Sequence, residues 1–390
     1  MKLQHIFADL HIHLGRTWTS KPVKITASGE MTLSAVLEEA STRKGLDMIG
    51  VIDCHVPEVL AELKQLIRQG RAVQLPGGGI RYGQTTLILG TELEICDEYC
   101  RGPVHVLCYL PTLEAMTRFS QWMSRYQKNI NLSSQRSYVP MRKLQKEVRA
   151  LEGLFVPAHV FTPYKSVYGK GVETFMSEVM DLDLVDGVEL GLSSDSHMAD
   201  QLPELHPFTF LTNSDAHSLS KIGREYQQLR VAEADFMHLK MALRKTDNQR
   251  VAANYGLDPK LGKYHHEVSE RLRQLASRQR EAAQQDVACV QGPRGRQTNR
   301  PADRPPYIYQ VPLEFIPGLG PRRLQKLIEV FGSEMAVIHN ASLDSLKQWV
   351  PEEVAVMIVK ARAGQATIKA GGGGQYGKVS YSQDASHRIE

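Results

Sequence analysis

Residues 4–13 read Gln-His-Ile-Phe-Ala-Asp-Leu-His-Ile-His, a short apolar run that closes on two histidines, His11 and His13. Side chains at positions i and i+2 of a strand project to the same face, so both imidazoles can reach one ion. A histidine pair alone is more often two ordinary surface residues. The same combination of a short apolar run and a nearby ligand-type side chain recurs along the first half of the chain, and this recurrence predicts the architecture.

Six further apolar runs follow, most of them separated by stretches with helical periodicity. The expected strands cover residues 4–10, 48–52, 86–95, 104–110, 154–161, 187–192 and 208–213. The expected helices cover residues 32–44, 58–69, 113–128, 141–151, 174–181 and 225–244. Strands that alternate with helices predict a βα architecture with a mostly parallel sheet, and seven such strands nearly close a barrel.

Every one of these strands carries a residue that can bind a metal ion. The residues are His11, His13, Asp53, His55, Glu92, His105, His159, Glu189, Asp215 and His217. In a βα barrel the C-terminal ends of the strands meet on one face, where active sites lie. A single histidine such as His105 would suit an ordinary core position, but the whole set indicates a metal centre. Imidazole-rich ligands favour Zn, Mn or Fe over Mg or Ca, and the two oxygens of Glu92 suit it to bridging two ions.

Clustered divalent ions predict hydrolysis of a phosphoester. They lower the pKa of a bound water to about 7 and neutralise phosphate charge during an in-line displacement. This chemistry requires no Ser-His-Asp or Cys-His nucleophile. Four basic residues near predicted strand ends can clamp phosphate oxygens, although plain surface charges would look the same. They are Arg16, Arg81, Lys165 and Arg224.

Composition excludes several classes of protein. The chain has 390 residues, 42% apolar and 23% charged, which suits two or three globular domains. No run approaches the ~20 apolar residues of a membrane span, and the N-terminus lacks the features of a secretory signal. The five cysteines are odd in number and lack paired CxxC spacing, which suits a reducing compartment. We therefore expect a cytoplasmic protein with no membrane partner.

The positive charge is concentrated in one segment. Residues 259–310 hold 10 basic and 5 acidic residues, whereas the whole chain has a net charge of only +4. Residues 264–285 are expected to form a polar helix, and 291–306 form a basic linker rich in Gly, Pro and Arg. Such a block favours a polyanion partner, although a solvated helix face would look similar.

A compact helical unit is expected near the C-terminus. Residues 315–328 read Phe-Ile-Pro-Gly-Leu-Gly-Pro-Arg-Arg-Leu-Gln-Lys-Leu-Ile and resemble a helix-hairpin-helix element. In such an element, glycines equivalent to Gly318 and Gly320 expose backbone N–H groups that grip a DNA phosphate, and Arg322 and Arg323 add charge. Residues 349–364 resemble a degenerate second copy. The alternative is a small helical dimerisation domain.

The barrel motifs resemble the polymerase and histidinol phosphatase (PHP) superfamily. They are the Asp-Leu-His-Ile-His opening, Thr-Glu-Leu-Glu around Glu92, Pro-Ala-His-Val around His159 and Ser-Asp-Ala-His at 214–217, all in family order. The resemblance covers residues 1–250. It implies a distorted seven-stranded βα barrel that binds up to three metal ions and hydrolyses phosphoesters.

The resemblance also implies ligand sets. His11, His13, Glu92 and Asp215 would hold the first ion, Glu92, His105 and His159 the second, and His217 would help to hold a third. Two departures concern that third ion. Ile52-Asp-Cys-His55 stands where the family usually has Thr-Asp-His, so either Asp53 or His55 takes the place of its histidine. A further histidine that usually follows the His-x-His pair is missing from residues 14–18.

Nearly end to end, the layout resembles the endonuclease Q family of DNA repair nucleases within this superfamily. The shared pieces are the barrel motifs, Leu-Gly-Lys-Tyr-His at 261–265, Arg-Pro-Pro-Tyr-Ile at 304–308, the Pro-Gly-Leu-Gly turn and a glycine-rich end. The resemblance implies that metal-activated hydroxide nicks DNA 5′ to uracil, hypoxanthine, xanthine or an abasic site, leaving a 3′-hydroxyl and a 5′-phosphate. Asp215, Glu92 and His13 would be the catalytic residues.

Some members of that family carry a four-cysteine zinc ribbon after Leu-Gly-Lys-Tyr-His. Only Cys289 remains in this segment, so no structural zinc is expected there. Two or three divalent ions, Zn or alternatively Mn, Mg or Fe, are expected in the barrel.

A pocket for the damaged base is expected beside the metal centre. The deaminated bases share a carbonyl next to a ring N–H, so one donor and one acceptor in a pocket would select them. The loops at 15–18, 77–84 and 162–168 are the expected location. The candidate substrate contacts are Arg16, Trp18, Arg81, Tyr82, Tyr164 and Lys165.

Four parts are expected along the chain: a nuclease barrel at 1–250, a basic helical and linker segment at 251–310, a helix-hairpin-helix-like unit at 311–368 and a flexible glycine-rich tail at 369–390. The expected partner is damaged DNA, duplex or single-stranded, with a sliding clamp as a further candidate and a monomeric state. Two rival functions stay open. One is a small-molecule phosphatase of the histidinol-phosphate type, and the other is a non-catalytic DNA-binding scaffold.

Overall fold

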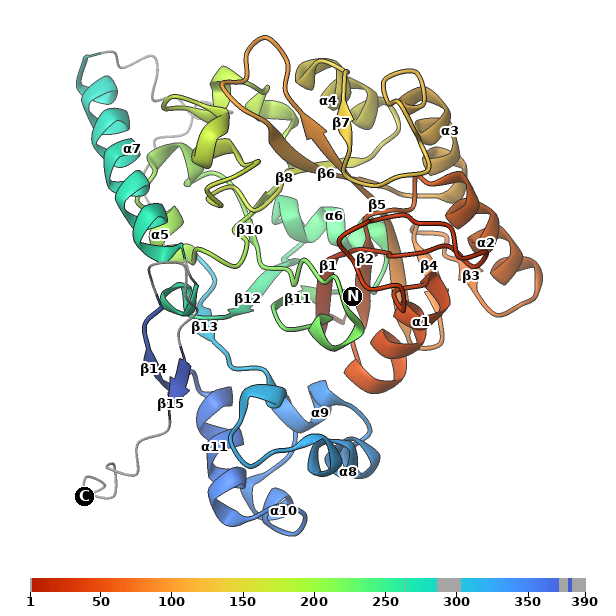
Figure 1. Ribbon diagram of the computed structural model, residues 1–390, viewed down its shortest axis with the longest axis vertical. Coiled ribbons are helices and arrows are strands. Elements are labelled where there is room, and N and C mark those ends of the chain that lie inside the picture. The colour runs from red at the N-terminus through yellow and green to blue at the C-terminus, as the bar shows by residue number, and fades with distance from the viewer. Residues whose placement is uncertain (1, 263, 286–302, 372–377, 381–390) are drawn as a thin grey trace.

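The computed structural model of the chain describes residues 2–262, 264–285, 303–371 and 378–380. It is a mixed α/β fold built on one large sheet, with strand order β13-β12-β11-β1-β2-β5-β4-β3; β6 and β7 (Arg136–Ser137) also pair with β5, and β8 pairs with β6. Figure 1 shows helices packed around this sheet and a separate group of C-terminal helices below it. Within the described ranges, no helix combines the length and apolar character needed to cross a membrane.

All seven expected strands occur, and several are shorter than expected. They are β1 (Gln4–Ile12), β2 (Met48–Val51), β5 (Thr85–Ile95), β6 (Val104–Leu110), β8 (Leu154–Pro157), β9 (Val188–Glu189) and β10 (Phe210–Leu211). The last three end early because the chain turns sharply just beyond them. His159 and Gly191 both have positive φ, at 29° and 74°. The turns carry the chain from the strands into the loops at this edge.

The expectation of a mostly parallel sheet is wrong. β1, β2 and β5 are parallel, but β6 is antiparallel to both β5 and β8. Only residues 96–103 join β5 to β6, and such a short link allows a hairpin but no crossover helix. As a consequence, His105 at the start of β6 pairs with Glu94 near the end of β5. His105 therefore reaches the same edge of the sheet as the C-terminal ends of β1, β2 and β5.

Backbone hydrogen bonds link the short strands to the main sheet. The N–H of Asp186 donates to the carbonyl of Phe155, which connects the region of β8 to that of β9. β9 pairs with β10 in parallel. Beyond β10, the N–H of Ala216 donates to the carbonyl of His11 and its own carbonyl accepts from His13. The last of the seven strands is thus followed by a segment that returns to the first.

The inner faces of these strands form one apolar cluster. Alternate residues of β1, Ile6, Ala8 and Leu10, belong to it, together with side chains from β2, β5, β6 and β8. Strands β1 and β2 approach so closely that a Cβ on Gly50 would lie 2.3 Å from the carbonyl oxygen of Leu10. A larger cluster fills the space between the sheet and the surrounding helices. The core therefore holds the strand ends in a fixed arrangement.

The helices largely follow the expected pattern. They are α1 (Leu33–Glu38) continued by a π-helical turn η1 (Glu39–Lys44), α2 (Pro57–Arg68), α3 (Leu113–Met123) and α4 (Met141–Ala150). Two expectations are wrong. The helix expected at 174–181 is reduced to a single 3₁₀ turn, Met176–Glu178.

The helix expected at 225–244 divides into strand β11 (Tyr226–Val231) and helix α6 (Phe236–Arg244). The buried side chains of Tyr226, Leu229 and Val231 belong to strand pairing, because β11 runs antiparallel to β1. A further strand, β12 (Arg250–Gly256), pairs with β11, and β13 (Tyr307–Tyr309) pairs with β12. Long-range pairing therefore overrides the local helical pattern here.

After the sheet, helix α7 (His265–Gln285) leads away from it, and the described chain resumes before β13. The C-terminal unit then consists of the 3₁₀ turn η9 (Leu313–Phe315), α8 (Pro321–Phe331), α9 (Glu334–His339), α10 (Leu343–Lys347) and α11 (Glu352–Arg362). A short hairpin, β14 (Thr367–Lys369) and β15 (Lys378–Ser380), follows. Cys289, most of the basic linker and most of the glycine-rich tail lie outside the described residues.

The C-terminal unit is fastened to the sheet by buried polar and aromatic contacts. The ammonium of Lys44 in η1 lies 3.0 Å from the carboxylate of Glu334 in α9, and both side chains are largely buried. The imidazole of His339 stacks on Phe7 of β1 at 4.2 Å between ring centroids. Its Nε2 shares a 2.7 Å hydrogen bond with the hydroxyl of Tyr226. These contacts fix the unit against β1 and β11.

Replacing Glu334 by alanine should destabilise the protein by about 3 kcal/mol, because it leaves the ammonium of Lys44 buried without its counter-ion. Chemical denaturation monitored by circular dichroism would measure this loss. Glu352→Ala is the matched control, since it removes an exposed ion pair with Lys347 in the same unit and should change little. Equal stability of the two variants would contradict the proposed anchoring role.

Candidate metal centre

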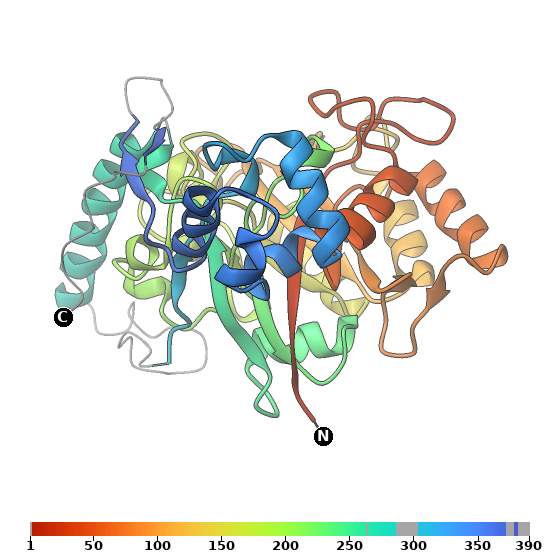
Figure 2. The ribbon, with the colours of Figure 1, turned by 90° about the horizontal axis from the view of Figure 1, so that it is seen from below.

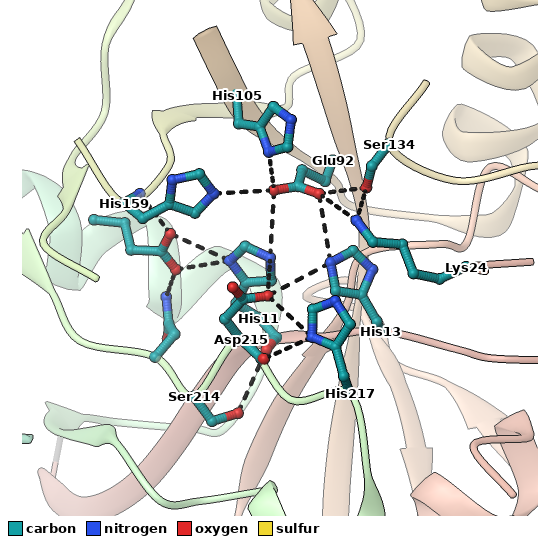
Figure 3. A network of polar contacts seen from close by, with 12 residues as sticks. His11, His13, Lys24, Glu92, His105, Ser134, His159, Ser214, Asp215 and His217 are labelled. Atoms are coloured by element: carbon teal, nitrogen blue, oxygen red, sulfur yellow. Dashed lines mark hydrogen bonds and ion pairs between the residues drawn. The ribbon is translucent and has the colours of Figure 1, made fainter. Parts of the chain in front are cut away.

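Seven of the eight expected metal ligands meet at one edge of the sheet, as Figure 3 shows. Their ligand atoms form three groups, in each of which the atoms lie within 4.8 Å of one another. The groups are His11 with His13 and Glu92; Glu92 with His105 and His159; and His13 with Asp215 and His217. Because the groups share Glu92 and His13, they form one continuous cluster.

Glu92 lies at the centre of this cluster. Its Oε1 is 2.7 Å from His105 Nδ1 and 3.3 Å from His159 Nε2. Its Oε2 is 3.4 Å from His13 Nε2. The two oxygens therefore face different histidines, which is the arrangement that a carboxylate bridging two ions requires.

Asp215 closes the cluster from the opposite side. Its Oδ1 lies 3.4 Å from His11 Nε2, 3.6 Å from His13 Nε2 and 3.6 Å from His217 Nδ1. Asp215 and His159 both have left-handed backbone conformations, with φ of 46° and 29°. Such conformations are unfavourable for residues other than glycine and concentrate at functional sites. Here they aim two side chains into the cluster from the ends of short strands.

Other polar residues orient the histidines. His11 Nδ1 is 2.9 Å from Glu189 Oε1, and His13 Nδ1 is 3.3 Å from Asp53 Oδ2. His159 Nδ1 lies 3.1 Å from the hydroxyl of Thr162. Contacts of this kind fix the ring and leave its other nitrogen free for a metal ion. Glu189 was recognised in the sequence as a ligand-type residue but not as an orienting partner of His11, because a sequence does not show which residues face each other.

Asp53 and His55 lie outside all three groups. Asp53 is fully buried, and it accepts a 2.6 Å hydrogen bond from the N–H of Leu14 in addition to its contact with His13. His55 is also buried, and its Nδ1 lies 2.7 Å from the hydroxyl of Thr91. The structure therefore places Asp53 as a support for His13 and not among the converging ligand atoms.

The donor atoms of this site fit divalent cations. His11 Nε2 and His13 Nε2 are buried and have no hydrogen-bond partner among the residues that the structure describes. Buried polar atoms almost always have partners, so unpaired nitrogens that converge on carboxylates indicate a site for cations. The chemistry of imidazole and carboxylate suits Zn and other transition ions.

Charge interactions in the metal-free site oppose the effect of burial. Burial disfavours the protonated form of His11, but the carboxylates of Glu189, Asp215 and Glu92 outweigh it and raise its pKa to about 10. Burial also disfavours the charged form of Glu92, which on its own would raise its pKa. His105 and Lys24 nevertheless hold that pKa well below its usual range. Protonated His11 and Lys24 thus supply positive charge among these carboxylates.

Lys24 and Ser134 are site residues that the sequence did not reveal. The ammonium of Lys24 donates to Glu92 Oε2 at 3.2 Å and to the hydroxyl of Ser134 at 2.6 Å, and Ser134 also donates to Glu92 (Figure 3). Both lie in loops without a recognisable motif. The chain thus holds a lysine cation beside its central carboxylate.

A cavity of about 810 Å³ opens beside the metal cluster. His159 and Asp215 line it on the cluster side, and Tyr164 lines it from the loop after β8. The rest of its wall includes Leu192, Lys221, Arg224, Leu257, Leu261, Tyr264 and Phe315. The cavity therefore lies between the sheet, the segment after β12 and the C-terminal unit.

The expected substrate contacts divide into near and distant residues. Tyr164 lines the cavity, and the ammonium of Lys165 lies 2.8 Å from Glu94, whose carboxylate also faces His105. Arg16 and Trp18 are exposed on the loop after β1 and do not line the cavity.

Arg81 and Tyr82 were expected beside the metal centre but lie far from it. They lie on strand β4 (Ile80–Tyr82), which pairs with the beginning of β5 around Thr85 and Thr86. Glu92 follows Thr86 by six residues along the same strand, a separation of roughly 20 Å at the usual rise per residue. The hairpin of β3 (Val73–Gln74) and β4 therefore lies at the far end of the sheet from the metal cluster.

The glycine turn of the C-terminal unit has the expected local geometry. Gly318 has a positive φ of 80°, and Gly320 is the N-cap of α8, with Pro321 at the first helical position. Arg322 and Arg323 are exposed, and Arg323 donates a 2.6 Å hydrogen bond to the carbonyl of Gly318. The start of α8 thus presents backbone N–H groups and basic side chains to the outside.

Comparisons with known proteins identify relatives over the whole chain. The chain is 50% identical over 391 residues to the uncharacterized protein YqxK of Bacillus subtilis, covering 97% of this chain and 100% of that protein. It is 36% identical over 254 residues to the uncharacterized protein MJ0043 of Methanocaldococcus jannaschii, covering 57% of this chain and 31% of that protein. No protein-family model matches the chain.

Two solved structures share the fold from end to end. The lesion-specific endonuclease PfuEndoQ of Pyrococcus furiosus has a TM-score of 0.80 and 25% identity, covering 99% of this chain and 98% of that chain. Endonuclease Q in complex with a 27-mer duplex substrate, with an abasic lesion at the active site, has a TM-score of 0.77 and 26% identity, covering 99% of both chains.

Replacing Asp53 by asparagine should weaken metal binding by about 10- to 100-fold, because the carboxylate that holds His13 Nδ1 is lost while the ligand itself remains. Competition titration with a fluorescent zinc chelator would measure the change. Asp47→Asn is the matched control, since Asp47 accepts from the N–H of Phe7 elsewhere on β1. Unchanged affinity of the Asp53 variant would contradict an orienting role.

Metal uptake should release protons at neutral pH. The raised pKa of His11, about 10, means that its imidazole is protonated in the metal-free protein at pH 7, and a ligand nitrogen must be neutral. Affinity should therefore rise as the pH increases toward 10 and fall in acid. Calorimetric titrations in two buffers with different ionisation enthalpies would count the protons, and a count of zero at pH 7 would refute the prediction.

Proposed function

We propose that the chain, which belongs to one family with YqxK and shares its fold from end to end with two endonuclease Q structures, is a metal-dependent DNA repair endonuclease of the endonuclease Q type. It would nick the phosphodiester 5′ to uracil, hypoxanthine, xanthine or an abasic site and leave a 3′-hydroxyl and a 5′-phosphate. The observation that carries the proposal is the cavity that opens directly on the ligands His159 and Asp215. A nucleotide in this cavity would bring its own 5′ phosphate to the metal cluster.

We interpret the seven strands, whose last member is followed by a segment that bonds back to the first, as a distorted PHP-type barrel within residues 1–250. Residues 251–310 then form the basic segment, 311–368 a helix-hairpin-helix-like unit and 369–390 the tail. The return of β13 to the large sheet supports close attachment of the second part to the first. Cytoplasmic location, a monomeric state and docking of a sliding clamp stay predictions.

The side chains present can hold up to three ions. His11, His13, Glu92 and Asp215 would hold the first, Glu92, His105 and His159 the second, and His13, Asp215 and His217 the third. Divalent ions such as Zn, Mn, Mg or Fe supply a water of lowered pKa, about 7, and neutralise phosphate charge when bound. Asp215, Glu92 and His13 touch more than one group, which supports their assignment as catalytic residues.

The residues of the chain would position the substrate around this centre. Lys24 holds Glu92 in place and supplies a fixed positive charge at the rim of the cluster. Lys221 and Arg224 place two further cations on the cavity wall, where they suit a DNA phosphate. The apolar part of the wall, including Tyr164 and Phe315, suits the flat face of an extruded base.

The C-terminal unit would bind the DNA backbone. The N-terminus of α8, with Gly318, Gly320, Arg322 and Arg323, offers N–H groups and positive charge to a phosphate. Phe315 of the same unit lines the cavity beside the metal cluster. DNA bound at α8 would therefore lie close to the centre that cuts it.

A labelled duplex with one deoxyuridine, incubated with Mg or Mn with and without a chelator, tests the proposal. We expect one metal-dependent nick just 5′ to the uracil, and no nick in the undamaged duplex. Hydrolysis of a small phosphate monoester without any nick would instead support the phosphatase alternative. Tight DNA binding without either activity would support a non-catalytic scaffold.

Asp215→Ala and His13→Ala should each reduce nicking on the order of a thousandfold while DNA binding stays nearly unchanged, because His13 belongs to two of the groups and Asp215 contacts histidines of two groups. Single-turnover kinetics and fluorescence anisotropy would measure the two properties separately. Asp183→Ala, which removes an exposed carboxylate, should behave as the wild type in both. Substantial nicking by either ligand variant would contradict the mechanism.

A further inference from the structure

The loop between β1 and α1 forms one rim of the metal cluster and is held firmly to it. The N–H of Lys24 donates to the carbonyl of Leu14 at 3.0 Å, and the N–H of Ser28 donates to the carbonyl of the ligand His217 at 2.8 Å. The two sides of the loop approach closely at Gly15, where a Cβ would lie 1.9 Å from the carbonyl oxygen of Ser28. With the contact of Lys24 to Glu92, these bonds fix the loop relative to two residues of the cluster.

Ile25 lies in this fixed loop and projects into solvent. Its side chain is 81% exposed, more than any other large hydrophobic side chain that the described part of the chain exposes. The two residues before it turn inward, since Val23 is fully buried and Lys24 reaches into the cluster, whereas Thr26 after it is exposed. The anchored residues on either side therefore determine where the isoleucine stands.

The surroundings of Ile25 suit a DNA backbone. Residues 14–29 contain three basic residues, Arg16, Lys21 and Lys24, and no acidic residue. Lys21 is paired with Glu58 and Lys24 with Glu92, so Arg16 supplies the remaining positive charge of the loop for a phosphate. Trp18 is a second exposed apolar residue of the loop, but its neighbour Thr19 is bonded to Glu58 of α2, so this part of the loop is held toward that helix.

The loop and the cavity lie on opposite sides of the metal cluster. In Figure 3, Lys24 lies on one side of Glu92 and the cavity-lining His159 lies on the other. Figure 2 shows the red loops that follow β1 at the end of that strand opposite the N-terminus. A strand whose phosphate reached the cluster would thus have the cavity on one side and Ile25 on the other.

We propose, on the basis of the proposed nuclease function, that Ile25 is a wedge that enters the base stack when the damaged nucleotide is extruded into the cavity. Extrusion costs the stacking and pairing free energy of the nucleotide. An apolar side chain that fills the vacated space recovers part of this cost and prevents the base from returning. A rigid loop suits this role, because little conformational freedom is lost when its tip enters the duplex.

Stopped-flow fluorescence with a duplex that carries 2-aminopurine opposite a single deoxyuridine tests the wedge. Extrusion of the uracil leaves the 2-aminopurine unpaired, and its fluorescence should rise before the metal-loaded wild type cuts the strand. Ile25→Ala should slow this rise about tenfold, since most of the apolar surface that would be buried is lost. Ile25→Phe should keep the rise, because phenylalanine also fills the space.

Val73→Ala is the matched control, because Val73 is another exposed aliphatic residue, 58% exposed on β3 at the far end of the sheet. It should leave the rise unchanged. A second readout is nicking of the same strand without its complement. No base has to leave a duplex there, so Ile25→Ala should cut at the wild-type rate, whereas a misfolded variant would fail on both substrates.

The outcomes separate the wedge from the nuclease function. If the wild type nicks normally and Ile25→Ala extrudes the base as fast as Val73→Ala, the wedge is refuted and the function stands. If the wild type neither raises the fluorescence nor nicks, the proposed function fails and the wedge fails with it. Equal loss by Ile25→Ala on duplex and single strand would also refute the wedge.

Discussion

The carboxylate of Glu92 is the point on which the arrangement of this protein depends. It is buried in a central strand, and its two oxygens contact His105 and His159 on one side and His13 and Lys24 on the other. A buried carboxylate is tolerated only when cations or strong hydrogen-bond donors surround it. Such groups reach Glu92 from three kinds of segment: the strands, the sharp turns at His159 and Asp215, and the loop that holds Lys24.

This requirement also explains why each carboxylate of the site faces a histidine or a lysine. The raised pKa of His11 indicates that its protonated imidazole balances the carboxylates around it, and Lys24 balances Glu92. Divalent ions would take the place of the protons on the histidines. Lys24 would keep its positive charge beside Glu92. Glu189 and Asp53 contact Nδ1 of His11 and His13, so both histidines would keep Nε2 directed toward a metal ion.

The gathering of ligand-type residues at one edge of the sheet was predictable from sequence, because most of them stand at or near the C-terminal end of an apolar run. Partner choice was not predictable, because it depends on which strands lie side by side. The antiparallel β6 places His105 correctly although a parallel strand was expected, and β11 pairs with β1 where a helix was expected. Arg81 and Tyr82 were misplaced for the same reason, since a hairpin returns them to the start of β5.

Only part of the cavity wall was predictable from local sequence. The loop after β8 was expected to form the pocket, and Thr162 and Tyr164 do line it. Leu257, Leu261 and Phe315 complete the wall from segments about a hundred residues or more further along the chain. Leu257 and Leu261 follow β12, whereas Phe315 reaches the wall through the docking of the C-terminal unit by Lys44, Glu334 and His339, which no local motif encodes.

The central claim is that this constellation is a metal centre in which Glu92 is shared between ions. Crystals of the protein grown with zinc or manganese, measured at the absorption edge of the metal, test it most directly. The account predicts anomalous peaks on both sides of Glu92, one among His11, His13 and Asp215 and one between His105 and His159. No peak at Glu92, with the contacts between histidines and carboxylates unchanged, would contradict it.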